Sequence, residues 1–325
     1  MRLATIGTSW ITEAFLQSAK KVGIEYKAAY SRDISRAEAF AEKNGAELCF
    51  DSLEEMSLCD EIDAVYIASP NSLHFEQSLL FLQAGKNVLC EKPAVIYPHQ
   101  LEKLYAEADS RGLIFMEAIM FLYQPELLKL KTAIRSIGTL SSAHLDFSQL
   151  SSKYKLLSES FTPNIFNPKL CTGCLMDIGI YNVYTAIELF GEPQKITAVS
   201  RFMSTGADSH GTAIFDYPEL QVTLNYSKVA QSHADSQILA DKGAVLIGSI
   251  SQLCGIRLCT LDGCVTQLTG ELDRLEVMSG EALAFLNFCT QKEAYSEQYR
   301  HARETALSVS RALEEIRRQN PQFLF

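Results

Sequence analysis

Short apolar runs alternate with helix-like segments over the first part of the chain. The runs predict buried strands at residues 3–6, 26–30, 46–50, 64–68, 87–90 and 113–116. In the segments between them, apolar residues recur at helical spacing, and helices are expected to end at Gly23, Gly45, Gly85 and Gly112. Strands that alternate with helices in this way predict an α/β fold with a doubly wound parallel sheet of the Rossmann type.

Beyond residue 119 the pattern changes, because strands now follow one another with few helices between them. Strands are expected at residues 140–147, 195–202, 211–215, 220–226, 236–240 and 244–247, and helices at 125–137, 175–189, 280–291 and 297–318. This order predicts a second, α+β domain with a mostly antiparallel open sheet. A length of 325 residues also favours two domains. We expect a dinucleotide-binding domain at 1–119 and a substrate and oligomerisation domain at 120–325.

The composition excludes several classes of protein. Hydrophobic residues make up 47% of the chain and charged residues 21%, as in ordinary globular proteins. A net charge of −10 argues against a nucleic-acid partner, because phosphate backbones are bound by basic faces. No apolar run approaches the roughly 18 residues of a membrane span, and the first strand begins too early for a secretory signal. We therefore expect a cytoplasmic protein with no membrane partner.

The nine cysteines are expected to be reduced thiols, as in other proteins of the cytoplasm. Cys171 and Cys174 have the C-x-x-C spacing of redox and metal pairs. No second pair of cysteines or histidines at zinc-like spacing accompanies them, so no metal is expected.

The first strand leads into the turn Gly7-Thr8-Ser9-Trp10-Ile11 and then into a helix. Strand, glycine turn and helix together are the context of a dinucleotide-binding fingerprint. The match to G-x-G-x-x-G is incomplete, because Ser9 holds the second glycine position and Thr12 the third. A plain strand–turn–helix therefore remains an alternative on these residues alone.

The end of the second strand indicates which cofactor is bound. At this position an acidic side chain normally takes the ribose hydroxyls of NAD. Here Ser31 and Arg32 occupy it, and Arg36 follows one helical turn later. A hydroxyl and two guanidinium groups suit a 2′-phosphate better, so NADP is favoured. NAD stays open, because a shift of two residues in the strand end would bring the carboxylate of Asp33 to this place.

Two further segments carry candidate catalytic residues. The buried strand at 87–90 delivers Glu91 and Lys92 to the carboxyl edge of the sheet, where ligands bind in such folds; the alternative is a solvated lysine. In the second domain, Asp177 and Tyr181 are spaced to share one face of an apolar helix. There the alternative is a core tyrosine whose hydroxyl is bonded to Asp177.

These segments together resemble the glucose–fructose oxidoreductase / inositol dehydrogenase (Gfo/Idh/MocA) family, and within it the NADP-linked dihydrodiol-dehydrogenase-like branch. The matching segments occur in the family's order and spacing over about the first 190 residues. They are Gly7-Thr8-Ser9-Trp10-Ile11, Ser31-Arg32, Pro70-Asn71-x-x-His74, Ala84 to Pro93, Met116-Glu117-Ala118, and Gly173-x-Leu175-x-Asp177-x-Gly179-x-Tyr181.

The resemblance implies hydride transfer between a nicotinamide and a hydroxyl-bearing carbon of a sugar, cyclic polyol or diol. It implies that Lys92 stabilises the developing alkoxide, that Tyr181 transfers the proton, and that Asp177 orients the substrate. Lys92 is then expected in a cleft between the two domains, within reach of Tyr181. Cofactor contacts are implied for Trp10 beside the nicotinamide and for a further set: Ser69, Pro70, Asn71, His74 and Glu91. A homodimer or a dimer of dimers is also implied.

The chain departs from the family pattern at several positions. Besides Ser9 and Thr12, Cys174 stands where glycine or alanine is usual, and Leu122-Tyr123 replaces a segment in which many relatives carry arginine. The alternative function is a catalytically silent dinucleotide-binding sensor or scaffold of the same fold. That alternative predicts loss of the catalytic residues, whereas Lys92, Asp177 and Tyr181 are all present.

Overall fold

The computed structural model describes residues 1–158 and 160–325, and they form two compact units. The first unit comprises Met1–Tyr123 with Asp273–Glu304, and the second comprises Gln124–Leu272 with Thr305–Phe325. The division therefore differs from the single boundary expected between residues 119 and 120. The reason is helix α8 (Arg274–Thr290), which packs against α1 (Trp10–Lys21) of the first unit.

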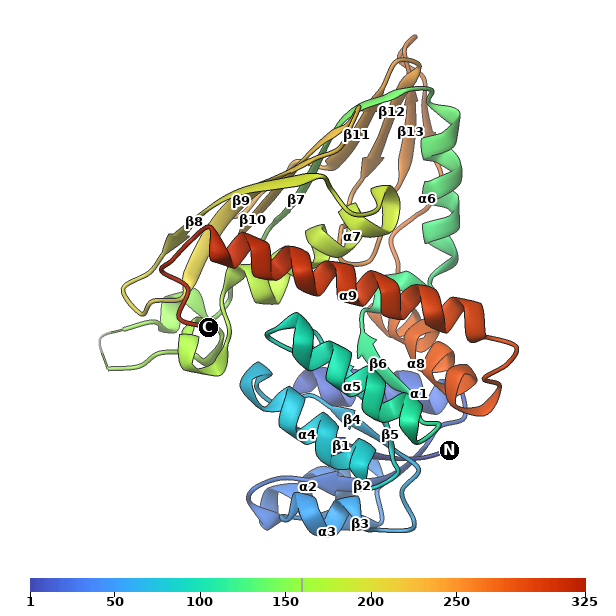
Figure 1. Ribbon diagram of the computed structural model, residues 1–325, viewed down its shortest axis with the longest axis vertical. Helices are drawn as coiled ribbons and strands as arrows, with labels where there is room; N and C mark the ends of the chain where they lie inside the picture. Colours follow the sequence, from blue (N-terminus) through green and yellow to red (C-terminus); the bar gives the residue numbers. More distant parts are fainter. Residues whose placement is uncertain (159) are drawn as a thin grey trace. The chain divides into compact units, whose positions relative to one another are not determined.

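The first unit contains a six-stranded, wholly parallel sheet in the order β3-β2-β1-β4-β5-β6 (Figure 1). This is the expected doubly wound sheet. Its strands are β1 (Arg2–Ile6), β2 (Glu25–Tyr30), β3 (Leu48–Phe50), β4 (Ala64–Ile67), β5 (Asn87–Glu91) and β6 (Phe115–Ala118). Its other helices are α2 (Ile34–Asn44), α3 (Leu53–Ser57), α4 (Asn71–Gln83) and α5 (Pro98–Ser110), with a 3₁₀ turn η1 (Met120–Tyr123).

Strand β6 begins two residues later than the sequence predicts. The N–H of Leu113 bonds to the carbonyl of Ala108 at 2.8 Å, in the turn that leaves α5. The N–H of Ile114 is taken by the side-chain oxygen of Asn87 at 2.9 Å. Both residues of the expected strand start are thus engaged by other groups, and ladder pairing with β5 begins at Phe115.

The second unit contains an eight-stranded sheet in the order β14-β13-β12-β11-β7-β10-β9-β8. All neighbouring pairs are antiparallel except β7 with β10, which confirms the mostly antiparallel sheet. The strands are β7 (Leu140–Ser148), β8 (Lys195–Phe202), β9 (Asp208–Asp216), β10 (Gln221–Ser227), β11 (Ser236–Ala240), β12 (Gly243–Ile247), β13 (Arg257–Thr260) and β14 (Val265–Gln267). The sequence analysis missed β13 and β14, which are short and form an exposed or half-buried hairpin at the sheet edge.

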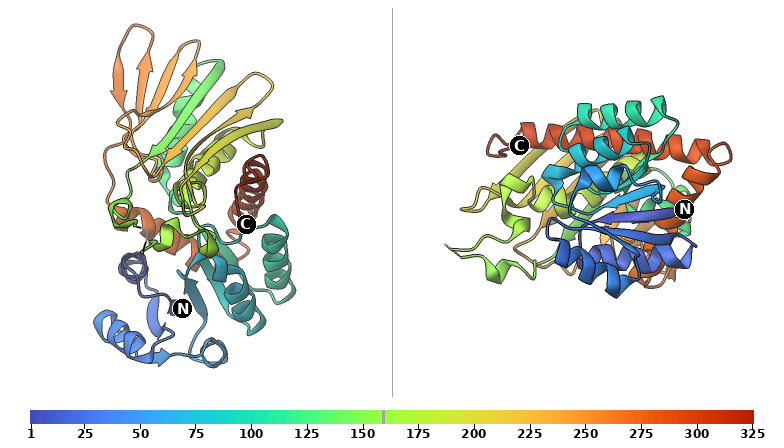
Figure 2. Two further views of the ribbon diagram at one scale, coloured as in Figure 1. Left: turned by 90° about the vertical axis from the view of Figure 1, so that its left-hand side faces the viewer. Right: turned by 90° about the horizontal axis from the view of Figure 1, so that it is seen from below.

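Helices cover one face of this sheet. They are α6 (Pro125–Ser136), α7 (Ile180–Phe190) and the part of α9 (Ser296–Arg318) that belongs to the second unit. Figure 2 shows no helix of the second unit's described residues over the opposite face. Three 3₁₀ turns precede α7: η2 (Tyr154–Leu156), η3 (Asn164–Phe166) and η4 (Pro168–Leu170).

The expected helix at 175–189 begins with a different geometry. Residues Leu175–Gly179 (η5) form one turn of π-helix, and the α-helix α7 starts only at Ile180. The N–H of Ile180 bonds to the carbonyl of Leu175, five residues back. A single α-helix was therefore the wrong expectation here, and the angular spacing of Asp177 and Tyr181 does not follow the α-helical period. Turns of π-helix occur frequently at functional sites.

Helix α8 also begins earlier than expected, at Arg274 instead of residue 280. The carboxylate of Asp273 caps it by accepting a hydrogen bond from Leu275 N at 3.2 Å.

One segment of the described residues, Pro168–Phe190, is long and apolar enough to cross a membrane, which the sequence analysis did not anticipate. Within it, 78% of the most apolar window is buried inside the protein. A core helix has this property, so the segment adds no evidence for a membrane span.

Candidate active site

The turn after β1 has a backbone that only glycine fits. Gly7 has φ +114°, and a Cβ at this position would lie 2.7 Å from the carbonyl oxygen of Ala68. Thr12, at the third fingerprint position, is fully buried below the turn and lies 3.5 Å from the hydroxyl of Ser9. Ser9 precedes the first turn of α1 and makes no side-chain cap, so the N–H groups at this helix start are available to an anion.

Two residues of the fingerprint contact other parts of the first unit. Trp10 is 65% exposed, and the guanidinium of Arg274 lies over its ring at 5.5 Å. The hydroxyl of Thr8 accepts a hydrogen bond from Arg36 at 3.3 Å. Ile11 is half-buried in the first turn of α1. The structure thus joins the glycine turn to Arg36, which the sequence places in the cofactor-selecting group.

At the end of β2, the structure shows which groups the side chain of Asp33 contacts. Its carboxylate caps α2 by accepting a hydrogen bond from Ser35 N at 3.0 Å. The hydroxyl of Ser31 accepts from the N–H of Asp33 at 3.3 Å, while Arg32 and Arg36 are exposed. Two cations therefore stand at the cofactor-selecting position, and the nearest carboxylate is bonded to a helix start.

Lys92 lies on a turn that is held from two sides. The Lys92–Pro93 peptide bond is cis. The buried ring of His74, on α4, bonds through Nδ1 to the carbonyl of Pro93 and through Nε2 to the carbonyl of Ser69, both at 2.8 Å. The carboxylate of Glu117, on β6, accepts a hydrogen bond from Ala94 N at 2.6 Å. Lys92 itself is half-buried.

The contacts of His74 show what its side chain does in the fold. Its ring is 1% exposed and faces two backbone carbonyls, so it holds the loops after β4 and β5. The cofactor contact that the resemblance implies for His74 stays a prediction. Burial lowers the pKa of His74, the two carbonyls act in the opposite direction, and the charge of Lys92 lowers it further. Ser69, Pro70 and Asn71 remain half-exposed at the start of α4. The hydroxyl of Ser69 donates to Gln77 at 2.6 Å.

Glu91 is engaged by a buried group that the sequence analysis missed. The hydroxyl of Tyr66, a fully buried residue of β4, donates to Glu91 at 2.5 Å. Glu281 of α8 is also buried, and its pKa is raised by burial and by the negative charge of Glu91. A sequence pattern of helical spacing places Glu281 on α8 but gives no sign that α8 returns to the first unit.

In the second unit Asp177 lies in the π-helical turn and Tyr181 in the first turn of α7. Lys228, which directly follows β10, forms an ion pair with Oδ2 of Asp177. The ring of Tyr181 meets the edge of Phe147 with centroids 5.7 Å apart. The sequence analysis also missed Lys228, although its position just after an alternating strand was a usable signal.

Cys171 and Cys174 are free thiols, and burial raises the pKa of both. Over residues 1–158 and 160–325 we find no group of three or more histidine, cysteine or acidic side chains able to hold a metal ion.

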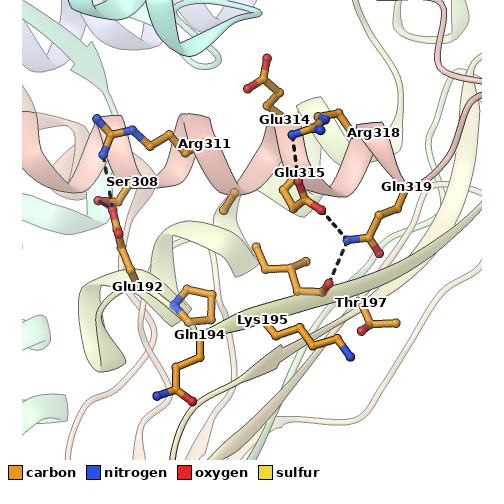
Figure 3. Close-up of a pocket in the computed structure, with 13 residues that line it drawn as sticks. Glu192, Gln194, Lys195, Thr197, Ser308, Arg311, Glu314, Glu315, Arg318 and Gln319 are labelled. Carbon is orange, nitrogen blue, oxygen red and sulfur yellow. Dashed lines mark hydrogen bonds and ion pairs between the residues drawn. The ribbon is translucent and has the colours of Figure 1, made fainter.

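A pocket of about 690 Å³ lies in the second unit between α9 and the start of β8 (Figure 3). Its charged groups pair with one another, as in Arg311 with Glu192 and Arg318 with Glu315. The amide of Gln319 bonds to Ile196 O at 2.8 Å and to Ala198 N at 2.9 Å, so it covers the backbone of the edge strand β8. The lining contains none of the residues predicted for catalysis or cofactor binding.

Comparison with known proteins identifies the family. The model of the Gfo/Idh/MocA oxidoreductases with an NAD-binding Rossmann fold matches residues 1–119. The model of the C-terminal domain of the same family matches residues 127–246.

Among curated relatives, the chain is 36% identical over 320 residues to the scyllo-inositol 2-dehydrogenase (NADP(+)) IolU of Bacillus subtilis, and the match covers 98% of this chain and 97% of the relative. It is 32% identical over 237 residues to the human trans-1,2-dihydrobenzene-1,2-diol dehydrogenase, covering 71% of this chain and 69% of that protein.

Among solved structures, the 3-ketoreductase KijD10 of Actinomadura kijaniata, in complex with NADP and TDP-benzene, has the same fold. Its TM-score is 0.87 at 23% identity, and the match covers 98% of this chain and 97% of that one. The matches of both domain models and the identity to the curated relatives establish that this chain belongs to the Gfo/Idh/MocA family of oxidoreductases.

Proposed function

We propose that the protein is an NADP(H)-dependent oxidoreductase that transfers a hydride between the nicotinamide and a hydroxyl or carbonyl carbon of a sugar, cyclic polyol or diol. The observation that carries this proposal is the turn of Lys92. A half-buried lysine follows β5 directly, and the buried side chains of His74 and Glu117 hold the backbone of the two residues that come after it. Fixed backbone positions of this kind are what a catalytic group requires.

The choice of NADP rests on the end of β2. Arg32 and Arg36 are exposed there, whereas Asp33 is bonded to the start of α2. Guanidinium groups bind a 2′-phosphate with charge-assisted hydrogen bonds. The names of two relatives agree, because one is an NADP(+)-dependent inositol dehydrogenase and the other is a ketoreductase with bound NADP.

The glycine turn fits the pyrophosphate of such a cofactor. The close approach of Gly7 to Ala68 and the uncapped start of α1 leave backbone N–H groups at the place where phosphates bind in this fold. When bound, the nicotinamide supplies the hydride acceptor or donor.

In the oxidation direction, the substrate loses a hydride from carbon and a proton from oxygen. We assign proton transfer to Tyr181, stabilisation of the alkoxide to Lys92, and substrate orientation to Asp177. A nearby ammonium lowers the pKa of a phenol and so raises the fraction of phenolate, which is the form of Tyr181 that can accept the proton. In the reduction direction the same groups act in reverse, and Tyr181 gives its proton to the carbonyl oxygen.

For the assembly we propose a homodimer or a dimer of dimers that uses the helix-free face of the eight-stranded sheet, in a cytoplasmic protein. Exposed side chains on that face include Val199 and Val265, at 52% and 56% exposure. Association would remove such apolar side chains from water.

The test is a screen of sugars, cyclic polyols, diols and their carbonyl forms with NADP⁺ or NADPH. The absorbance of the reduced nicotinamide measures turnover. Lys92→Ala and Tyr181→Phe should lower kcat for the best substrate by about a hundredfold or more while NADPH still binds. Matched controls at exposed or half-exposed positions are Lys20→Ala and Tyr295→Phe, which should leave the rate unchanged. No turnover in the screen, or wild-type rates in both site variants, would refute the proposal.

A further inference from the structure

A buried carboxylate lies at the start of the helical segment that carries Asp177. Asp208, the first residue of β9, is 1% exposed. Its Oδ2 accepts a hydrogen bond from Leu175 N at 2.7 Å. Its Oδ1 has no hydrogen-bond partner among the described residues. Asp208 therefore caps the π-helical turn from a neighbouring strand.

The turn before this helix is shaped around the same carboxylate. Gly173 has φ +157°, and a Cβ on it would collide with Oδ1 of Asp208. Any other residue at 173 would push Asp208 away from Leu175. The absence of a side chain at Gly173 thus leaves the room that the Asp208 carboxylate occupies.

Lys228 lies beside the strand that begins at Asp208, and its side chain pairs with Asp177. Its backbone N–H bonds to the carbonyl of Ser209 at 2.9 Å, which fixes it beside the start of β9. Its carbonyl accepts from Ser151 N at 2.9 Å. Its side chain is 10% exposed, and its ammonium is paired with Oδ2 of Asp177, whose side chain is 28% exposed. The lysine is therefore anchored at its backbone and reaches from the interior towards a more exposed carboxylate.

The charges around Lys228 come from the two acids. Burial raises the pKa of Asp208 to about 7, against the opposing effects of the helical N–H groups and of Lys228. Cys174 and Tyr226 also face this region, and burial raises the pKa of each, so both are neutral near pH 7. Lys228 is then the one cation among these five groups, and its ammonium is paired with Asp177.

We propose that Lys228 is a positioning residue of the active site, which holds the Asp177 carboxylate in the orientation that receives a substrate hydroxyl, while Asp208 caps the π-helical turn that carries Asp177. The inference rests on the proposed function, in which Asp177 orients the substrate. An ammonium bonded to one carboxylate oxygen keeps the acid ionised and limits its rotation. A polyol hydroxyl then meets an acceptor of fixed direction, which lowers the cost of ordering the complex.

The test compares Lys228→Met, which removes the charge and keeps the chain length, with Lys228→Arg, which keeps the charge. Lys228→Met should lower kcat/KM for the polyol by about tenfold to a hundredfold, mainly through KM, as expected for loss of a bond to a charged group. Lys228→Arg should keep most of the wild-type kcat/KM, because it keeps the charge. NADPH binding should stay within about twofold of wild type in both, as it should in the control Lys195→Met at an exposed position of β8.

A double-mutant cycle separates positioning from a general structural effect. If Lys228 acts through Asp177, Lys228→Met should change kcat/KM by less than about threefold in the Asp177→Asn background. An equal loss in both backgrounds would overturn the proposal, and so would an unchanged KM in the single variant.

A readout without turnover keeps this inference distinct from the proposed function. With ¹³C-carboxyl-labelled aspartate, the Asp177 signal, assigned by its absence in Asp177→Asn, should titrate at a higher pH in Lys228→Met than in wild type. Failure of the wild type to oxidise or reduce any polyol would refute the proposed function. An Asp177 titration that is the same in both proteins would refute the role of Lys228.

Discussion

The Oε1 of Glu117 accepts a hydrogen bond from the N–H of Ala94 at 2.6 Å, and this bond joins the end of β6 to the turn that carries Lys92. Ala94 is fully buried and Glu117 is 8% exposed, so water competes little for either group. His74 holds the adjoining carbonyl of Pro93 from α4. Two elements far apart in the sequence therefore fix the backbone that places the proposed catalytic lysine.

Removing the acceptor at residue 117 should loosen this turn. Glu117→Ala leaves a buried N–H unsatisfied, and we expect the free energy of unfolding to fall by about 2–3 kcal/mol and kcat to fall with it. Glu117→Gln keeps an oxygen in the same place and should lose about 1 kcal/mol. Denaturant unfolding and steady-state rates check this order, with Glu42→Gln as an exposed control. Equal stability of the two Glu117 variants would contradict it.

His74 should make stability depend on pH below about 6.5. Burial lowers its pKa, so the folded protein holds the ring neutral at pH values where the unfolded chain takes up a proton. Its contribution is complete above the unfolded pKa of about 6.5 and is lost as the pH falls towards the folded value. The neutral ring has one N–H to donate to the two backbone carbonyls that it faces, so His74→Phe leaves a buried carbonyl unpaired and should cost about 1–3 kcal/mol at pH 8.

The difference in unfolding free energy between wild type and His74→Phe should therefore become smaller as the pH falls from 8 to 5. Unfolding free energies of both proteins across this range measure it. A difference that is constant, or that grows in acid, would show that His74 is not held neutral in the folded protein.

Much of the fold follows from periodicity. Alternating buried strands and helices predict the parallel sheet. A continuous apolar run such as Ala64–Ile67 is typical of a strand that helices cover on both faces, as they do in parallel sheets. Periodicity does not show which unit a helix joins: α8 follows the second sheet in sequence, yet Ser18 of α1 donates to its Leu275 carbonyl at 2.9 Å. It also cannot detect the π-helical turn at Leu175–Gly179, which depends on tertiary bonds such as Asp208 to Leu175.

The candidate site was predictable where its residues belong to local motifs. Gly7 stands in a strand–turn–helix context that one short segment shows, although its close approach to Ala68 becomes visible only in the folded chain. Lys228 and Glu281 belong to no such motif. Lys228 pairs with Asp177, and the charge of Glu91 acts on Glu281. The two members of each pair are remote in the sequence and come together only in the folded chain.

Arg32 and Arg36 should determine the preference for NADP over NAD. We expect Arg32→Ala and Arg36→Ala each to raise the dissociation constant of NADPH by about tenfold, as for a lost bond to a phosphate, and to leave that of NADH unchanged. Fluorescence titration of both cofactors measures this, with Arg135→Ala as an exposed control in the second unit. The assignment is wrong if wild type binds NADH as tightly as NADPH and Arg32→Ala leaves NADPH binding unchanged.

Asp208 should destabilise the protein progressively as the pH rises towards 7. Its folded pKa of about 7 lies above the unfolded value near 3.9, so the folded state keeps a proton that the unfolded chain has released. Stability is therefore highest in the protonated form and falls with rising pH until about 7. From pH 5 to 7 the loss is about 2 kcal/mol, because the slope of 1.36 kcal/mol per unit falls to half at the pKa itself.

Asp208→Asn keeps an oxygen for Leu175 N and does not titrate, so its unfolding free energy should gain about 3 kcal/mol on wild type between pH 5 and 8. Asp63→Asn is the matched control. The guanidinium of Arg2 lowers the pKa of Asp63, so that acid stays ionised from pH 5 to 8 and its variant should differ from wild type by a constant amount. Parallel curves for wild type and Asp208→Asn would mean that Asp208 is ionised in the folded protein throughout this pH range, and that burial does not keep it protonated.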